Sequence, residues 1–390
     1  MVEGGGFGIP SFAGPVQARS VSRAAGRTRL SMILVAVAVA RVFLGIIASS
    51  EAGGITIGYS NCQSVALLGQ TAIMQIAQLR WYFTHASVGQ NMRDGVGDLH
   101  ALDASHYPVV TASDDSMPPT STANGVIYEY NRGNPGWLAK TTDFTACVQN
   151  GWRFPRVNLA VNKLCYIDQD ADAATYLNAM RALETNYPET VFVYMTMPLT
   201  TGQDYDNYLR SVFNETVRSW VATNGCALFD IADIESHDTN GVVQTYLYNS
   251  RTCEKLFGGY TTDGGHLDDA GNRGRDLVAK GFYALAAALF EADRDGDGLR
   301  DGDELISGTC PTRAASAFRV TGIATPTNGT VRLMWPSNTN RVYGVQRTAD
   351  LAGSWSNLVS GIAATPPGNT YNDTNAVGGA RWFYRVLVRQ

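Results

Sequence analysis

Leu79-Arg80-Trp81-Tyr82-Phe83 is a short apolar and aromatic run, and it leads directly into Thr84-His85-Ala86-Ser87-Val88-Gly89. A run of this length and composition predicts a buried β-strand. A serine close to a glycine directly after such a run indicates a hydroxyl presented where a strand ends. These two stretches therefore place a first candidate reactive group, Ser87, at the edge of a sheet.

Along the rest of the chain, apolar runs alternate with longer helical patterns. Further strands are predicted at 157–166, 191–195 and 227–231, and helices at 173–186, 205–223 and 270–291. Strands that alternate with helices of this length predict an α/β fold, in which a parallel sheet has helices on both faces. Reactive residues gather at the carboxyl ends of the strands in such sheets, and both Ser87 and Asp168 lie just past predicted ends.

The length of 390 residues favours more than one domain. We expect four parts: an N-terminal extension with a signal peptide at 1–52, an α/β domain at 53–291, a linker at 292–312 and a small all-β sandwich at 313–390. The sandwich is predicted because short segments in the last part alternate apolar and polar residues between turn signals.

The N-terminal part has the layout of a signal peptide. An apolar stretch over 32–49 follows three arginines and ends in small residues, so cleavage is expected after Ser50 or Ala52. Arg41 interrupts the apolar stretch, and a charge at a bilayer centre costs roughly 2.5–3.5 kcal/mol. We therefore expect a secreted or cell-surface protein with no stable membrane span after the signal is cleaved.

Composition excludes some classes of partner and site. The net charge is −5, and neither a nucleic acid nor an anionic membrane is expected as a partner, because both need a basic face. The six cysteines form no Cys-x-x-Cys pair, which argues against a zinc or thioredoxin-like site. In an exported protein some of these cysteines would pair as disulfides.

Asp263-Gly264-Gly265-His266-Leu267 supplies the groups that a serine nucleophile needs. A serine hydroxyl is a weak nucleophile and requires a base, which a neutral histidine provides near pH 7. A carboxylate on the other ring nitrogen fixes the tautomer. Asp263 and His266 are three residues apart on one short loop, so both can face Ser87 if the two loops meet. The sequence thus predicts a Ser87–His266–Asp263 triad that needs no cofactor for catalysis.

The stretch from Phe83 to Gly89 resembles the nucleophile block of a subgroup of SGNH (GDSL-like) hydrolases that has His-x-Ser-x-Gly in place of Gly-Asp-Ser. Asp263 to Gly271 is similar to that family's last block, and the segments 163–168 and 229–236 are also similar to parts of this subgroup. The resemblance covers about residues 79–289. It implies a flavodoxin-like three-layer α/β/α fold and ester hydrolysis, often of acyl groups on carbohydrates or lipids.

The resemblance also implies an oxyanion hole, and here the sequence departs from the family. The expected donors are the N–H groups of Ser87 and Gly133, with the Asn134 side chain as a further donor. The usual Gly-x-Asn-Asp block is absent, and 163–168 stands in its place. Whether Asn162, Lys163 or no residue replaces the missing asparagine is left open.

His85 and Lys163 are candidates for the substrate pocket, each with a plainer alternative. His85 lies two residues before Ser87, so both side chains point to one side if the chain stays extended. His85 then lines the acyl pocket or acts as another base, or it only hydrogen-bonds to loop backbone. Lys163 touches a substrate oxygen, or pairs with Asp168 as a buried cation, or faces solvent.

The acidic stretch from Asp293 to Glu304 matches a twelve-residue calcium loop. Calcium prefers six to eight hard oxygen ligands, and this spacing wraps them around one ion, with Gly298 at the sharp turn. The expected ligands, at positions 1, 3, 5, 7, 9 and 12, are Asp293, Asp295, Asp297, the Leu299 carbonyl, Asp301 and Glu304. This stretch and the residues after it resemble the thrombospondin type 3-like repeats between domains of secreted bacterial proteins, which implies a structural Ca²⁺.

The last part resembles a terminal β-domain of many secreted bacterial enzymes, with surface attachment or substrate targeting as its expected role. Its aromatic residues form a sugar-stacking platform or fill the core; they are Trp335, Tyr343, Trp355, Trp382 and Tyr384.

Taken together, the sequence predicts a secreted serine esterase that acts on O-acyl groups of carbohydrate or on another ester. One alternative is a non-catalytic carbohydrate- or surface-binding protein that keeps the α/β shell, favoured by the missing asparagine block and the accessory parts. Another is a transferase that uses the same triad. Fold-level resemblance alone does not choose among these functions.

Overall fold

The structure is a computed structural model that describes residues 54–390 except 114–122, 151–156, 269–272, 327–328 and 377–380. The predicted signal peptide at 1–52 therefore lies outside the described residues. In the described part, none of the helices combines the length and the apolar character needed to cross a membrane.

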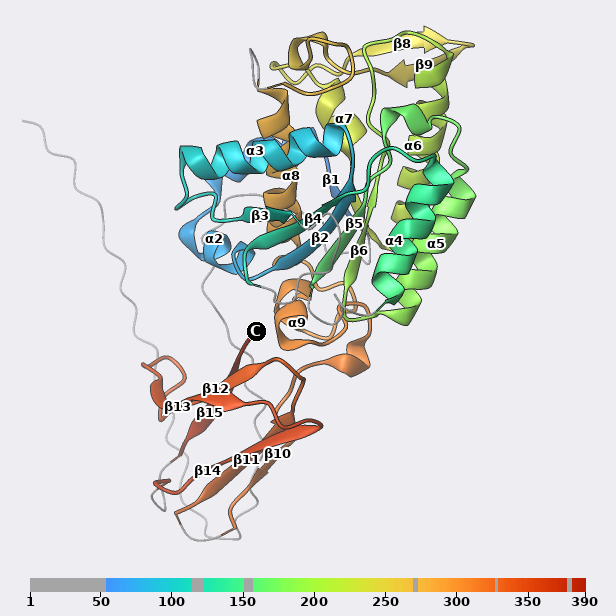
Figure 1. Ribbon diagram of the computed structural model, residues 1–390. Helices are drawn as coiled ribbons and strands as arrows, with labels where there is room; N and C mark the ends of the chain where they lie inside the picture. Colours follow the sequence, from blue (N-terminus) through green and yellow to red (C-terminus); the bar gives the residue numbers. More distant parts are fainter. Residues whose placement is uncertain (1–53, 114–122, 151–156, 269–272, 327–328, 377–380) are drawn as a thin grey trace, which may run out of the picture. The chain divides into compact units, whose positions relative to one another are not determined.

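A parallel sheet of seven strands forms the centre of the α/β part, in the order β1-β7-β6-β5-β2-β4-β3 (Figure 1). The strands are β1 (Ile55–Ile57), β2 (Arg80–His85), β3 (Val110–Ser113), β4 (Val126–Asn131), β5 (Leu159–Asn162), β6 (Val191–Met195) and β7 (Ala227–Phe229). Every neighbouring pair is parallel. The five inner strands run β4-β2-β5-β6-β7, which is the flavodoxin-like order 2-1-3-4-5, and β3 and β1 extend its two edges. The predicted fold class is confirmed.

Helices cover both faces of the sheet (Figure 1). One face holds α1 (Tyr59–Ser64), α2 (Gln70–Ile76), α3 (Val88–Leu102) and α8 (Gly274–Leu289), and the other holds α4 (Trp137–Gln149), α5 (Ala173–Asn186) and α6 (Tyr205–Asn224). Strand β2 is buried along its whole length. Its side chains alternate, so Trp81 and Phe83 join the core under α8 while Tyr82 joins the core under α4 to α6.

Local sequence explains where the longer helices begin, end and pack. The carboxylates of Asp172 and Asp204 cap α5 and α6 by accepting backbone N–H groups, and Gly225 ends α6 in the left-handed conformation. Gly281 lets α8 lie directly on β7, because a Cβ there would stand 2.2 Å from the Phe229 ring. This close contact brings α8, and the loop before it, over the sheet.

Two predicted strands are shorter than the sequence indicated. The strand predicted at 157–166 is β5 alone, because the chain leaves the sheet after Asn162 and forms a 3-10 turn at Tyr166–Asp168. The strand predicted at 227–231 ends at Phe229, since Asp230 caps the short helix α7 (Ile231–Ser236). Helix α8 begins at Gly274, and the predicted start at residue 270 lies outside the described residues.

The C-terminal part forms two antiparallel three-stranded sheets, as expected for a small all-β domain. One contains β10 (Gly322–Ala324), β11 (Val331–Pro336) and β14 (Gly368–Asp373), and the other contains β13 (Ser356–Ala363), β12 (Val342–Thr348) and β15 (Phe383–Arg389). Trp335 and Tyr343 are buried in its core with Leu333 and Val345. These two aromatic residues therefore fill the core.

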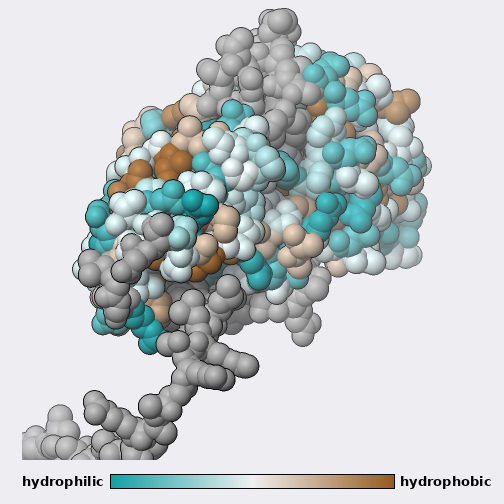
Figure 2. All heavy atoms as spheres, turned by 90° about the horizontal axis from the view of Figure 1, so that it is seen from below, coloured by the Kyte–Doolittle hydropathy of each residue, from teal (hydrophilic) through white to brown (hydrophobic). Residues whose placement is uncertain are grey.

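Figure 2 shows the surface of the protein from below, relative to the view of Figure 1. On this face the hydrophobic residues form only small separate patches among hydrophilic residues.

Candidate active site

Ser87 occupies a sharp turn between β2 and α3. Its backbone has φ 56° and ψ −115°, in a region that non-glycine residues rarely adopt. Such strain concentrates at functional positions, and a strained turn between a strand and a helix exposes a serine hydroxyl at the sheet edge. Ser87 is also the N-cap of α3, so the positive end of the helix dipole lies at its N–H.

Gly89 explains why the motif continues as Ser-x-Gly. A Cβ at Gly89 would stand 2.3 Å from Cβ of His85, which no side chain tolerates. The glycine therefore allows the first turn of α3 to fold back onto the end of β2. The Gly89 N–H donates to the Ala86 carbonyl at 3.0 Å, which closes the turn around Ser87.

The loop at 261–268 brings His266 and Asp263 to this turn. Ser87 Oγ lies 2.6 Å from His266 Nε2, and His266 Nδ1 lies 2.6 Å from Asp263 Oδ2. The loop is tied to α3, because the Leu267 N–H donates to Asn91 Oδ1 at 3.2 Å. The three side chains that the sequence pointed to thus form one hydrogen-bonded chain.

The chemistry of this chain follows from its contacts. The backbone N–H of His266, its ring and the Gly265 N–H all hydrogen-bond to the Asp263 carboxylate and hold its pKa well below its usual range. An ionised Asp263 accepts from Nδ1–H, so Nε2 is left to accept the Ser87 proton. The His266 side chain is 40% exposed and that of Asp263 is 55% exposed, so a substrate can reach this open triad (Ser87, His266 and Asp263).

Tyr166 also reaches the open triad, although the sequence did not single it out. Its hydroxyl lies 3.5 Å from His266 Nε2, and its ring stands edge-on to the imidazole with centroids 5.5 Å apart. Burial raises the pKa of the Tyr166 phenol. No short motif marks this residue, because its place depends on the packing of two distant loops.

Five charged or titratable side chains lie beneath the triad with at most 2% of their surface exposed, and we call them the sealed layer: His85, Glu129, Lys140, Lys163 and Asp168. His85 Nε2 lies 2.8 Å from Glu129 Oε2. Burial lowers the pKa of His85, against the opposing effect of Glu129. Fully enclosed in this way, His85 lines no open pocket, and its partner is a carboxylate rather than the loop backbone.

Lys163 is equally enclosed, and it does not pair with Asp168. Its Nζ lies 3.1 Å from the Leu164 carbonyl and 3.5 Å from the Ala86 carbonyl, directly before Ser87. Burial lowers its pKa. The partner of Asp168 is Lys140, with Nζ 2.6 Å from Oδ2. Both pocket candidates, His85 and Lys163, are thus placed behind the serine turn instead of in front of it.

The predicted oxyanion loop follows β4, next to the end of β2. His85 and Asn131 are partners in the register, and the Arg132 N–H donates to the His85 carbonyl at 3.0 Å. Gly133 has φ +70°, and its N–H donates to Asn131 Oδ1 at 3.2 Å. Asn134 is exposed. The Gly133 N–H must release Asn131 Oδ1 before it can donate to a substrate oxygen. The roles of Gly133 and Asn134 as oxyanion donors therefore stay predictions.

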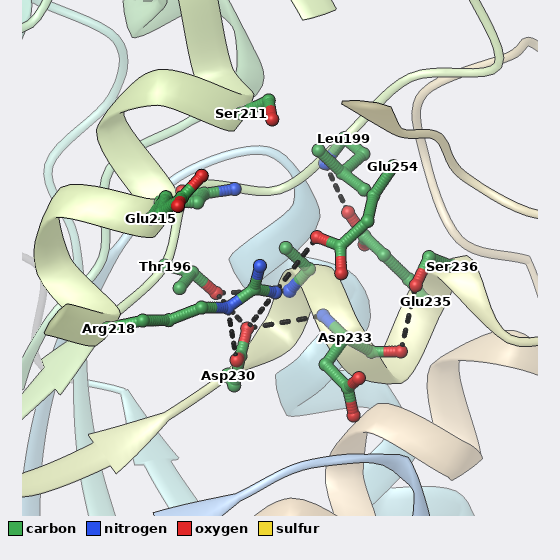
Figure 3. A network of polar contacts seen from close by, with 12 residues as sticks. Thr196, Leu199, Ser211, Glu215, Arg218, Asp230, Asp233, Glu235, Ser236 and Glu254 are labelled. Atoms are coloured by element: carbon green, nitrogen blue, oxygen red, sulfur yellow. Dashed lines mark hydrogen bonds and ion pairs between the residues drawn. The ribbon is translucent and has the colours of Figure 1, made fainter. Parts of the chain in front are cut away.

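A second polar network supports the site from the β6 side (Figure 3). Arg218 makes two hydrogen bonds to Asp230, at 2.6 and 2.8 Å, and one to Glu254 at 2.9 Å. Glu235 is fully buried and accepts the Leu199 N–H, while burial raises its pKa to about 8. The loop that Glu235 holds continues to Thr201, whose N–H donates at 2.9 Å to the Gly264 carbonyl in the loop that contains Asp263 and His266.

The acidic loop before α9 (Asp301–Ser307) gathers carboxylates. One oxygen each of Asp293, Asp295 and Asp297 lies within 4.8 Å of the others. Asp295 Oδ2, Asp297 Oδ2 and Glu304 Oε2 are buried without a hydrogen-bond partner. Arg294 donates to both carboxylate oxygens of Asp301, through its backbone N–H and its Nε. The role of Asp301 as a ligand stays a prediction.

Five of the cysteines are buried free thiols, so the expected disulfides are not formed among them: Cys62, Cys165, Cys226, Cys253 and Cys310.

Neither a protein-family model nor a curated protein matches this sequence. Among solved structures, the chain is similar to one from Desulfitobacterium hafniense DCB-2, provisionally described as a lipolytic protein of the G-D-S-L family. The two sequences are 10% identical, and the match covers 53% of this chain and 99% of the other with a TM-score of 0.33. A TM-score this low carries no argument, so the fold and the site rest on the features described above.

Proposed function

We propose that this protein is a serine esterase of the SGNH type. The single observation that supports it most is the unbroken chain from Ser87 Oγ through His266 to Asp263, with Ser87 on a strained turn at the carboxyl edge of a parallel sheet. Nucleophile, base and carboxylate within hydrogen-bond reach are the arrangement that acyl transfer from an ester requires.

In the proposed reaction, Ser87 Oγ attacks the ester carbonyl carbon while His266 Nε2 takes the hydroxyl proton. The C–O bond to the alcohol then breaks, and Nε2 returns that proton to the departing oxygen. A water molecule attacks the acyl-serine in the second half, again through His266, and the carboxylic acid leaves. Asp263 keeps the imidazole in the correct tautomer and stabilises its protonated form.

The Ser87→Ala variant tests this function. We expect hydrolysis of 4-nitrophenyl acetate to fall by roughly 10⁴–10⁶-fold with the melting temperature retained. Ser250→Ala is a matched control, since Ser250 also has a positive φ, of 65° against 56° for Ser87. Hydrolysis by Ser87→Ala at the wild-type rate would exclude the proposed function.

We propose O-acyl groups on carbohydrate as the substrate class and the outside of the cell as the location. These proposals rest on the resemblance of the catalytic blocks and on the signal-like segment at 1–52. Release of acetate from acetylated polysaccharide, measured against a triglyceride, tests the substrate. A preference for the triglyceride would contradict it.

We also propose that the acidic loop holds one structural Ca²⁺. The fit is supported by three carboxylate oxygens that are buried without a hydrogen-bond partner, on Asp295, Asp297 and Glu304, beside the exposed Asp293. Hard oxygen donors of this kind suit Ca²⁺. Calcium at 100 times its Kd would add about 2.7 kcal/mol to the free energy of unfolding. We expect chelation to lower the melting temperature of wild type but not of Glu304→Gln, and to leave ester hydrolysis intact in the folded protein.

A further inference from the structure

We propose that the Tyr166 hydroxyl is the side-chain donor of the oxyanion hole, in the place that an asparagine occupies in the family this chain resembles. The inference rests on the proposed esterase function and adds a catalytic residue to it. Four observations carry it: the enclosure of Asn162 and Lys163, the position of the loop, the anchoring of Tyr166 and the position of its hydroxyl.

Two of the other candidates, Asn162 and Lys163, cannot reach a substrate. Asn162 is 1% exposed and its Oδ1 accepts from Arg132 Nη1 at 2.7 Å. Lys163 is 0% exposed and directs its ammonium group to the carbonyls of Ala86 and Leu164. Both lie behind the serine turn, so neither side chain can donate to an oxygen in front of it.

The loop that contains Tyr166 starts beside the serine turn. Strand β5 pairs with β2, and Asn162 is the register partner of Thr84, three residues before Ser87. The chain after β5 therefore emerges at the same edge of the sheet as Ser87. Tyr166 is half-buried there, while Ile167 after it is exposed.

Tyr166 is held in place at its backbone and along its ring. Its carbonyl accepts from Arg210 Nε at 2.7 Å, and Arg210 is itself 4% exposed. The ring packs against Gly265, where a Cβ would stand 3.0 Å from the ring. Asp168 closes the turn by accepting the Cys165 N–H at 2.7 Å and the Lys140 ammonium. A donor fixed in this way costs little reorganisation when charge develops.

The hydroxyl lies beside the reacting groups of the triad. It lies 3.5 Å from His266 Nε2, which is itself 2.6 Å from Ser87 Oγ. A contact of 3.5 Å is long for a hydrogen bond, and such contacts often tighten only when substrate is bound. Because burial raises its pKa, the phenol keeps its proton and stays a donor across the neutral range.

No bond to Tyr166 forms or breaks in this role. As Ser87 Oγ adds to the carbonyl carbon, the C=O electron pair moves to oxygen, and the Tyr166 O–H and the Ser87 N–H donate to it. When the tetrahedral intermediate collapses, the electron pair returns and the alcohol leaves with the proton from His266. The same donors act again when water attacks the acyl-serine.

The test is Tyr166→Phe, which removes only the hydroxyl. We expect kcat to fall by about 10²-fold with little change in KM, as for loss of one oxyanion donor. The loss should be equal for 4-nitrophenyl and phenyl acetate, and rapid-mixing kinetics should show acylation and deacylation slowed alike. Tyr205→Phe is the matched control: Tyr205 is 53% exposed on another part of the domain and should keep full activity.

Three results would overturn the inference, and they are distinguishable from failure of the function itself. Full activity of Tyr166→Phe, with Ser87→Ala inactive, would exclude Tyr166 as an oxyanion donor and leave the proposed esterase function unaffected. A loss confined to acylation and larger for phenyl acetate would mean that Tyr166 assists the leaving alcohol instead. Activity in Ser87→Ala would exclude both proposals. A melting temperature within a few degrees of wild type shows that the kinetic change is not unfolding.

Discussion

The open triad and the sealed layer each contain a histidine that is hydrogen-bonded to a carboxylate, but the two histidines differ in what else they can contact. The His266 side chain is 40% exposed and its Nε2 accepts from the Ser87 hydroxyl, whereas His85 is 0% exposed and faces Glu129. A buried ionisable group must be paired or change its protonation, and it cannot exchange protons with a substrate. Exposure, rather than residue type, therefore separates the histidine suited to catalysis from the histidine that holds the fold.

Replacing each histidine by glutamine should give the largest difference between the two regions. We expect His266→Gln to reduce ester hydrolysis by roughly 10⁴-fold or more with an unchanged melting temperature. We expect His85→Gln to lower the free energy of unfolding by about 2–4 kcal/mol, because Glu129 loses a buried partner, with activity per folded molecule retained within roughly tenfold. Hydrolysis rates and denaturant unfolding on the same samples give both values, and exchanged results for the two variants would contradict the distinction.

The pair beneath the site should give the next largest effect. Lys140→Met leaves the Asp168 carboxylate buried with only the Cys165 N–H, and we expect a loss of about 3–5 kcal/mol in the free energy of unfolding. The double variant Lys140→Met with Asp168→Asn should recover much of that loss. Arg181→Met breaks a pair with Glu184 in which the arginine side chain is 54% exposed, so it should cost less than about 1 kcal/mol. Equal losses in the free energy of unfolding for Lys140→Met and Arg181→Met would show that the Asp168 carboxylate is not shielded from water.

A dependence of stability on pH should come from Glu235, and over any single pH unit it is smaller than the effects above. Its pKa is raised from 4.5 to about 8 in the folded protein, so the folded state binds the proton more tightly than the unfolded state does. Its contribution to stability is therefore full below pH 4.5 and falls as the pH rises to about 8, by up to about 1.4 kcal/mol per pH unit.

Glu235→Gln should remove that slope, because a glutamine side chain does not titrate. The fold should be retained, since its amide oxygen can still accept the Leu199 N–H. Glu215→Gln is the control, since the Glu215 side chain is 65% exposed. Unfolding by urea at pH 5, 6, 7 and 8 measures the slope. An identical slope in Glu235→Gln and wild type would mean that Glu235 is ionised in the folded protein throughout this range.

Sequence patterns predicted the parts of this molecule that are locally encoded. The alternation of apolar runs and helical segments identified the parallel sheet, and α5 was predicted at the observed bounds, Ala173–Asn186. Ser87, Asp263 and His266 stand in short motifs whose spacing already indicates their chemistry, and the structure brings their side chains together. The calcium ligands of the acidic loop were predicted in the same way, from spacing alone, and they stay a prediction.

The remainder depends on contacts between distant segments. The sequence offered Asp168 as a partner for Lys163, but α4 inserts Lys140 there, 28 residues before Asp168. Arg294 donates to the carboxylate of Asp301 from within the same loop, a contact that the spacing of the acidic residues did not predict. Tyr166 gains its position from Arg210, 44 residues later, and from Gly265. None of these pairings leaves a periodic or spaced signal in the sequence.

The central claim is that Ser87 is made nucleophilic by His266 in the open triad. Labelling of the full chain with a fluorophosphonate, followed by peptide mass spectrometry, tests it most directly. We expect one adduct, on Ser87, whose formation is lost in His266→Gln although that variant is folded. An unlabelled wild-type protein that is well folded, or an adduct at another residue, would contradict it.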